Sequence, residues 1–150
     1  MSAGSADPYA PFRPVTGARV ARVTAVASVL VFGLIAVLGP SDAGSTLAMS
    51  LLNRVFIAGF GVAMAAFLWR YALIRAVPSR TGLTVVNLVQ REEVEWGQIV
   101  HVGFSGGSPW VVLELSDTEE LAVMAIQRAD GGRARREAAR LAALVEHHQR

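Results

Sequence analysis

The chain has 150 residues, is 53% hydrophobic, and carries a formal net charge of +2 from 14 basic and 12 acidic side chains. A chain this apolar is not intrinsically disordered, and so small a net charge gives no argument for nucleic-acid binding. It contains no cysteine, which excludes disulfides, thiolate catalysis and cysteine-ligated zinc.

Residues 1–19 are rich in Ser, Ala, Gly and Pro, and this composition predicts a flexible cytoplasmic tail. Pro8, Pro11 and Pro14 recur at every third position. That spacing leaves open a polyproline ligand for a partner domain, beside the simpler interpretation of a disordered terminus.

Two apolar runs, at residues 20–38 and 47–69, predict a transmembrane hairpin. The first run has no charge from Val23 to Leu38, and its 19 residues would extend roughly 28 Å as a helix, close to the bilayer hydrocarbon thickness of about 30 Å. A chain of this size is too small to surround a helix that is apolar on every side. A cleaved signal peptide, with a weak small-residue site at Ser41–Ala43, is the alternative; the second run that follows at once favours a span.

Arg54 interrupts the second run, which is strictly uncharged only from Val55 to Trp69. With Leu47 as its start, the helix is long enough to span and the Arg54 side chain can extend to the headgroups. Alternatively, the helix is shifted inward and continues past Arg70. Small residues that allow close helix packing fall near one face, although an alanine-rich composition also explains them: Gly59, Ala63 and Ala66.

Basic residues flank the predicted hairpin on both sides, whereas the connecting segment holds Asp42. The flanking residues are Arg13, Arg19 and Arg22 before the first run and Arg70, Arg75 and Arg80 after the second. The bias of basic residues toward the cytoplasmic side predicts a multi-pass protein of the inner (plasma) membrane with both termini in the cytoplasm.

Beyond the hairpin, the hydrophobic pattern changes to that of short antiparallel strands. The expected strands cover residues 70–77, 83–89, 99–104, 110–115 and 121–126. The polar or glycine-rich segments between them, including Arg91–Glu93, are expected to be turns, so that Glu92, Glu93 and Glu95 would be solvated.

The last segment is predicted to be a helix, with Asp130 as its N-cap. Between Arg133 and His147 the apolar residues recur at helical spacing, so one face of this helix should lie on the sheet. The expected core of the domain consists of Trp96, Ile99, Trp110, Leu113, Leu115, Leu141 and Leu144. For the two tryptophans, core or sheet-surface packing is the simpler interpretation than a binding platform.

Three stretches carry a resemblance to a known family: Trp96–Ile99, Pro109–Leu115 and Ala125–Arg136. Together with the hairpin they resemble the actinobacterial membrane-anchored PH-domain proteins of the low-molecular-weight protein antigen 6 type. The resemblance implies an α+β membrane protein, in which a two-helix transmembrane hairpin (20–69) precedes a PH-like antiparallel partial β-barrel (70–150) capped by a C-terminal α-helix. It implies no reaction.

The sequence predicts no catalytic residue, cofactor or metal, and hence no enzyme. Gly103–Gly107 matches the G-x-S-x-G pattern of a hydrolase nucleophile elbow, but an elbow requires a helix after it, and a strand is expected at Trp110. His147 and His148 are adjacent on a helix, point in different directions and have no evident third ligand for a metal.

Two functions remain. The first is an interaction or scaffold module at the inner membrane face, which binds a protein partner or further copies of itself. The second is a sensor of anionic lipid headgroups. The residues expected to contact headgroups are Arg70, Arg75, Arg80, Arg133, Arg136 and Arg140. An ordinary solvated helix face, with an Arg133–Glu137 pair, is the alternative explanation for the arginines of the last helix.

Overall fold

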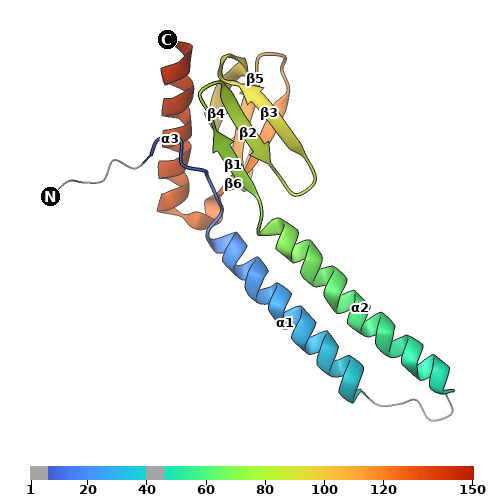
Figure 1. Cartoon of the computed structure of the whole chain (residues 1–150). Helices are drawn as coiled ribbons and strands as arrows, with labels where there is room; N and C mark the ends of the chain where they lie inside the picture. Colours follow the sequence, from blue (N-terminus) through green and yellow to red (C-terminus); the bar gives the residue numbers. More distant parts are fainter. Residues whose placement is uncertain (1–6, 40–45) are drawn as a thin grey trace. The chain divides into compact units, whose positions relative to one another are not determined.

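The computed structural model describes residues 7–39 and 46–150 (Figure 1). These residues form two compact units. One combines the N-terminal residues up to Gly17 with Ile74–Arg150, and the other is Ala18–Leu73.

The second unit is a pair of helices, α1 (Thr16–Leu38) and α2 (Leu47–Tyr71). Both are long and apolar enough to cross a membrane, judged by length and composition. The helix α1 begins four residues before the predicted start, and α2 begins where expected and continues past Arg70. Many of the large apolar side chains of both helices are exposed, which is the pattern of helices surrounded by an apolar medium.

Small residues form the contact between α1 and α2. Ser28 is buried, and its Oγ donates to the carbonyl oxygen of Gly61 at 3.2 Å. A Cβ added to Gly61 would lie 2.5 Å from the Cβ of Phe32, so only glycine allows this approach. Gly59, Ala63 and Ala66, the expected packing face, are instead exposed. The sequence thus indicated the right kind of residue on the wrong face of the helix.

Arg54 binds the C-terminal end of α1. Its Nη1 donates to the carbonyl oxygens of Ala36 and Val37, both at 2.6 Å, and its Nη2 donates to that of Gly39 at 3.1 Å. The last carbonyls of a helix lack partners within the helix and carry partial negative charge. The charge that interrupts the second apolar run is therefore bound within the hairpin.

The first unit contains two three-stranded antiparallel sheets and a C-terminal helix. The first sheet consists of β1 (Arg75–Pro78), β2 (Gly82–Val86) and β3 (Arg91–Glu95). The 3-10 turn η1 (Trp96–Gln98) leads into the second sheet, β4 (Ile99–Gly103), β5 (Trp110–Leu115) and β6 (Glu120–Gln127). The 3-10 turn η2 (Arg128–Asp130) and α3 (Gly132–Gln149) complete the chain. The predicted antiparallel domain with a C-terminal helix is confirmed.

Three predicted boundaries are wrong. The strand expected at 83–89 ends at Val86, and residues 87–90 form the turn to β3. The first strand begins at Arg75 because α2 continues to Tyr71. Arg91–Glu93 is part of β3 and not a turn. Within the described residues, β3 pairs only with β2. It buries Val94, and Arg91, Glu93 and Glu95 are exposed at this sheet edge, whereas Glu92 is half-buried.

The side chain of Asn87 joins the two sheets. Its Nδ2 donates to the carbonyl oxygen of Ala122 at 2.7 Å, and its Oδ1 accepts from the backbone N–H of Met124 at 3.2 Å. One amide group thus pairs with β6 as a neighbouring strand would.

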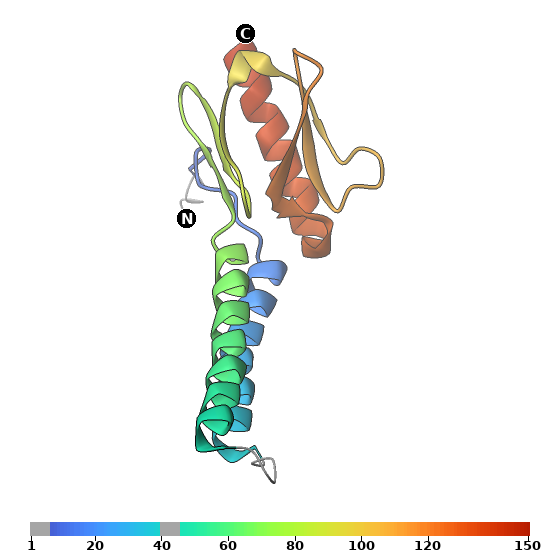
Figure 2. The same ribbon diagram turned by 90° about the vertical axis from the view of Figure 1, so that its right-hand side faces the viewer.

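The helix α3 runs along both sheets (Figures 1 and 2) and closes the core. At its C-terminal end, Gln149 Nε2 donates to the carbonyl oxygens of Trp96 (2.9 Å) and Ile99 (2.7 Å). Trp96 Nε1 in turn donates to the carbonyl oxygen of Ser79 at 3.0 Å. The fully buried side chains include Leu83, Val85, Ile99, Val111, Leu113, Val123 and Leu141.

Five of the seven expected core residues are buried: Trp96, Ile99, Leu113, Leu141 and Leu144. Trp110 and Leu115 are only half-buried. A register irregularity separates Trp110 from Val111, and Leu115 is the last residue of β5, so neither position is enclosed from both sides. The expected N-cap at Asp130 is also wrong, because α3 begins at Gly132 after Gly131, whose φ is 59°.

The predicted flexible tail is wrong for the residues that the structure describes. Residues 8–15, called the strap below, lie against β1 and α3, and Phe12 is only 1% exposed. The backbone N–H of Phe12 donates to the carbonyl oxygen of Ala76 at 2.8 Å, and that of Ala76 donates to Phe12 at 3.0 Å. The strap thus extends the first sheet beyond β1. Residues 1–6 lie outside the described part of the chain.

Candidate functional site

The six arginines expected to contact lipid do not form one patch. Arg70 is in the last turn of α2, Arg75 begins β1, and Arg133 and Arg136 are in the first turns of α3. Arg80 lies in the β1–β2 turn, which contacts Trp96 through Ser79 and so lies near the C-terminal end of α3. Since the 18 residues of α3 extend about 27 Å, Arg80 and Arg133 lie near opposite ends of the domain.

The side chain of Arg140 packs against the strap. Its guanidinium carbon lies 3.9 Å from the centroid of the Phe12 ring, and its Nη2 lies 2.8 Å from Glu137 Oε2. The side chain is 26% exposed. Arg140 therefore stabilises the packing of the strap and does not present a free charge.

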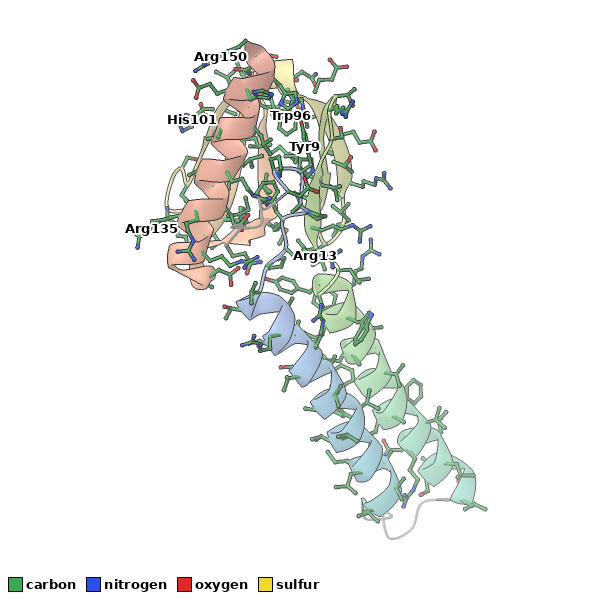
Figure 3. All side chains as sticks on the ribbon, turned by 60° about the vertical axis from the view of Figure 1, so that its left-hand side comes forward. Tyr9, Arg13, Trp96, His101, Arg135 and Arg150 are labelled. Carbon is green, nitrogen blue, oxygen red and sulfur yellow. The ribbon has the colours of Figure 1, made fainter. Side chains whose placement is uncertain are left out.

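The exposed basic residues at the start of α3 are Arg133, Arg135 and Arg136. Arg135 projects from the helix in Figure 3 and, with Arg128, lines a hollow of about 330 Å³ that also includes Phe104. Arg128 is fixed there, because its Nε donates to the carbonyl oxygen of Ser108 at 2.7 Å. Arg128, which the sequence did not predict as a headgroup contact, thus belongs with Arg135 to this basic end of the domain.

Asp130 binds the end of the strap. Its Oδ1 accepts from the backbone N–H of Thr16 at 2.8 Å, and its Oδ2 accepts from that of Val15 at 3.1 Å. Partial burial alone would raise the pKa of this carboxyl. The hydrogen bonds from Thr16 and Val15, together with the charge of Arg133, outweigh burial and hold the pKa below its ordinary value.

The outer face of the second sheet contains a hollow of about 440 Å³. Its floor is apolar, because Val112 on β5 lies opposite Gly103 on β4 and Ala122 on β6. The β4–β5 loop, which projects from the sheet in Figure 2, forms its rim. The residues that line the hollow are Ser105, Gly106, Ser108, Trp110, Val112, Glu120 and Ala122.

A row of titratable residues borders this hollow. Glu114 on β5 lies directly opposite Glu120 on β6 and, on its other side, opposite His101 on β4. Like charges that face each other across strands are destabilising. Neither glutamate forms an ion pair within the described part of the chain, so this row presents uncompensated negative charge.

One comparison with known proteins concerns this domain. Residues 75–143 match the model of the bacterial PH domain family. The domain is therefore PH-like, and it is called the PH domain below. The family match begins at β1. The strap, which completes the first sheet of the PH domain, therefore lies outside the matched residues.

Three curated relatives are each 35% identical to the chain over 82 residues. One is an uncharacterised protein of Mycobacterium bovis, and two are uncharacterised proteins of Mycobacterium tuberculosis, from strains CDC 1551 and H37Rv. The matched region is 55% of this chain and 53% of each relative, so the chain spans about half the length of the curated relatives it matches. No solved structure matches the chain.

The PH domain does not place Gly103–Gly107 in the context of a nucleophile elbow. This segment joins β4 to β5, and the strand-to-helix turn that an elbow requires is absent from it. The His147–His148 pair is likewise not arranged around a common point. His148 Nε2 lies 3.0 Å from the hydroxyl of Tyr9, and its ring stacks on Trp96 at 5.0 Å. Within the described residues, no group of three or more His, Cys, Asp or Glu side chains is arranged to hold a metal ion.

Sequence reasoning missed the strap, Asn87 and the hollow on the outer sheet face. Phe12 gave one available signal, since it is the only large apolar side chain among the prolines between Tyr9 and Val15. Asn87 gave none, because a turn asparagine is common and its role depends on a strand 35 residues away.

Proposed function

We propose that this protein is a non-enzymatic interaction module, which its two apolar helices anchor in the plasma membrane with the PH domain at the inner face. The observation that carries the proposal is the pairing of Phe12 with Ala76. The strap precedes α1 and β1 follows α2, yet both belong to one folded domain. A domain cannot fold across a bilayer, so this pairing supports a topology in which both ends of the helix pair lie on the same side of the membrane.

The arginine distribution supports the cytoplasmic side. Arginines lie near the start of α1 and near the end of α2. Near the segment that connects the two helices the one arginine is Arg54, whose side chain binds α1 carbonyls. We expect that a reporter protein which is active only in the cytoplasm will be active when it is fused after Arg150. A fusion that is active only outside the cell would overturn this orientation.

The outer face of the second sheet is the surface that we assign to a protein partner. It combines an apolar hollow with uncompensated carboxylates at its border, which suits a segment that carries apolar and basic side chains. No part of the described chain covers this hollow, and its lining includes Trp110, a residue type enriched at interfaces.

Photo-crosslinking in native membranes tests this assignment. A photoreactive residue in place of Ala122, inside the hollow, should give an adduct with a second protein chain. The matched control replaces Glu93, an exposed position on the first sheet, and should give no such adduct. Recovery of only monomer from Ala122, or of the same adducts from both positions, would count against the proposal.

Recognition of anionic lipid headgroups is a second candidate, favoured by the basic end of the domain. The hollow between Arg128 and Arg135 opens beside Gly131, at the start of α3, and Arg133 and Arg136 are exposed nearby. This end also carries Asp130, which binds the backbone where the strap leads into α1. Basic residues near an anionic membrane surface contribute about 1 kcal/mol each.

The test uses the full chain in neutral detergent with phosphatidylglycerol as the probe, measured by native mass spectrometry. Replacement of Arg133, Arg135 and Arg136 by Gln should reduce lipid retention. The control replaces Arg80 and Arg91, which are exposed at other positions of the domain, and should retain the lipid. Equal retention by both variants would exclude this basic end as the headgroup site.

A further inference from the structure

We propose that the groove between β1 and α3 is a peptide-binding groove, which the strap occupies in cis and which a partner protein occupies in trans with an extended segment that carries an aromatic side chain. This goes beyond the interaction function proposed above, because it concerns a different face of the domain and adds a means by which binding is regulated.

The strap is held in the way that a bound peptide is held. Phe12 and Ala76 exchange two backbone hydrogen bonds, at 2.8 and 3.0 Å, along the edge of β1 that does not pair with β2. Addition of an extended segment to a free sheet edge is a recurrent mode of peptide recognition, in which the backbone gives affinity and side-chain pockets give specificity.

The specificity pocket of this groove holds the ring of Phe12. The ring is 1% exposed, and the guanidinium carbon of Arg140 lies 3.9 Å from its centroid. Two residues further along, Pro14 is also buried, as expected when alternate side chains of an extended segment point inward. At the other end of the strap, the hydroxyl of Tyr9 lies 3.0 Å from His148 Nε2, beside Trp96 in Figure 3.

The strap fills the groove incompletely. The Nε donor of Arg140 is buried and has no hydrogen-bond acceptor within the described part of the chain. Only one residue of the strap forms a β-bridge with β1. A buried donor without a partner is unfavourable, so a segment that places an acceptor beside its aromatic ring would satisfy a group that the strap leaves unpaired.

Displacement of the strap regulates the groove. A partner binds only those molecules in which the strap is released. The smaller this released fraction is, the weaker is the apparent affinity for the partner. A change that weakens the strap therefore strengthens binding in trans. The opposite result is expected if Phe12 is merely a core residue, because its removal then creates no site.

The chain's own strap supplies the probe. A fluorescent peptide of residues 7–16 is titrated into the full chain in neutral-lipid nanodiscs. The Phe12→Ala chain should bind it at least about tenfold more tightly than the unmodified chain, because its groove is no longer filled. The same peptide with Phe12→Ala should not bind. The control chain, Val100→Ala, removes an exposed side chain of β4 and should behave as the unmodified chain.

Equal affinity of the Phe12→Ala and unmodified chains, with the variant folded by circular dichroism, would overturn the proposal. Hydrogen exchange on the unmodified chain gives an answer even if Phe12→Ala does not fold. The Ala76 amide, which donates to Phe12, should exchange faster than the protected amides of β5 at the centre of its sheet. Exchange of Ala76 only at the rate of those amides would show that the strap is not released, and would refute the proposal. Neither measurement depends on the outer face of the second sheet.

Discussion

Asp130 binds the backbone at the point where the strap leads into α1. A carboxylate in this position stabilises the folded state because its two oxygens accept from the N–H groups of Val15 and Thr16, which lack other described partners. The prediction that Asp130 is the N-cap of the last helix is wrong, because this carboxylate accepts from backbone N–H groups at the start of α1. The sequence could not show this contact, because its partners lie more than a hundred residues earlier.

Replacement of Asp130 by Asn should make stability less dependent on pH. The pKa of Asp130 is held below its ordinary value in the folded state, so its contribution is fully present above about pH 4 and is lost as the pH falls through the folded pKa. We expect the variant to be less stable by about 1 kcal/mol at pH 7, because its amide offers one acceptor oxygen where the carboxylate offers two, and the difference to shrink as the pH falls through the folded pKa of Asp130. Thermal unfolding across this pH range measures it. A difference that grows toward low pH would contradict the assignment.

Asn87→Ala should loosen the junction between the two sheets. The substitution leaves the carbonyl oxygen of Ala122 and the N–H of Met124 without their partner, at a cost of about 1–3 kcal/mol. Denaturant unfolding of the full chain should show a lower midpoint. Gln90→Ala is the control in the same turn, because its side chain is exposed. An equal decrease of the unfolding midpoint in both variants would show that a change in the turn, and not loss of the Asn87 amide contacts, causes the destabilisation.

At the scale of elements, length and hydrophobic period were sufficient for the two apolar helices, most strands and the last helix. They failed at β3, where a single buried residue, Val94, leaves too little alternation to distinguish a strand from a turn. Length and hydrophobic period also failed to predict which face of α2 packs against α1. Gly59 and Gly61 are only two residues apart, and the contact with α1 is what distinguishes the packed glycine from the exposed one.

Gly61→Ala should destabilise the helix pair, whereas Gly59→Ala should not. The new Cβ at position 61 would lie 2.5 Å from the Cβ of Phe32, which cannot move without its backbone, and overpacking of this kind costs about 1–3 kcal/mol. At position 59 no atom lies within 4 Å, and alanine favours the helix by about 1 kcal/mol. Unfolding in mixed micelles compares the two. Similar stability for both would show that the helices do not pack through Gly61.

At the scale of the whole molecule, the PH domain extends beyond the segment that the family match defines. The strap was missed because composition reports the average of a segment, and one phenylalanine among prolines scarcely changes that average. The candidate sites show the same limit. Each arginine was visible in the sequence, but whether it is exposed, as Arg133 is, or packed on an aromatic ring, as Arg140 is, depends on the fold.

A fragment of residues 74–150 should therefore be less stable than the same fragment joined through a long flexible linker to residues 7–15. Burial of a phenylalanine side chain contributes about 2 kcal/mol, which in a domain of this size corresponds to at least about 8 °C in Tm. Differential scanning calorimetry measures the difference. The fused fragment with Phe12→Ala is the control and should melt like the unfused fragment. Identical melting of all three would show that the strap does not stabilise the domain.

The pairing of Phe12 with Ala76 gives the two apolar helices the topological role of a β-turn. They connect two neighbouring antiparallel segments of one sheet, as a short loop does in other proteins, but over a connection long enough to cross a bilayer twice. In the topology proposed above, the sheet can therefore be completed only after both crossings are made. A chain inserted with a single crossing would place the strap and β1 in different compartments, so completion of the sheet reports that the membrane topology is correct.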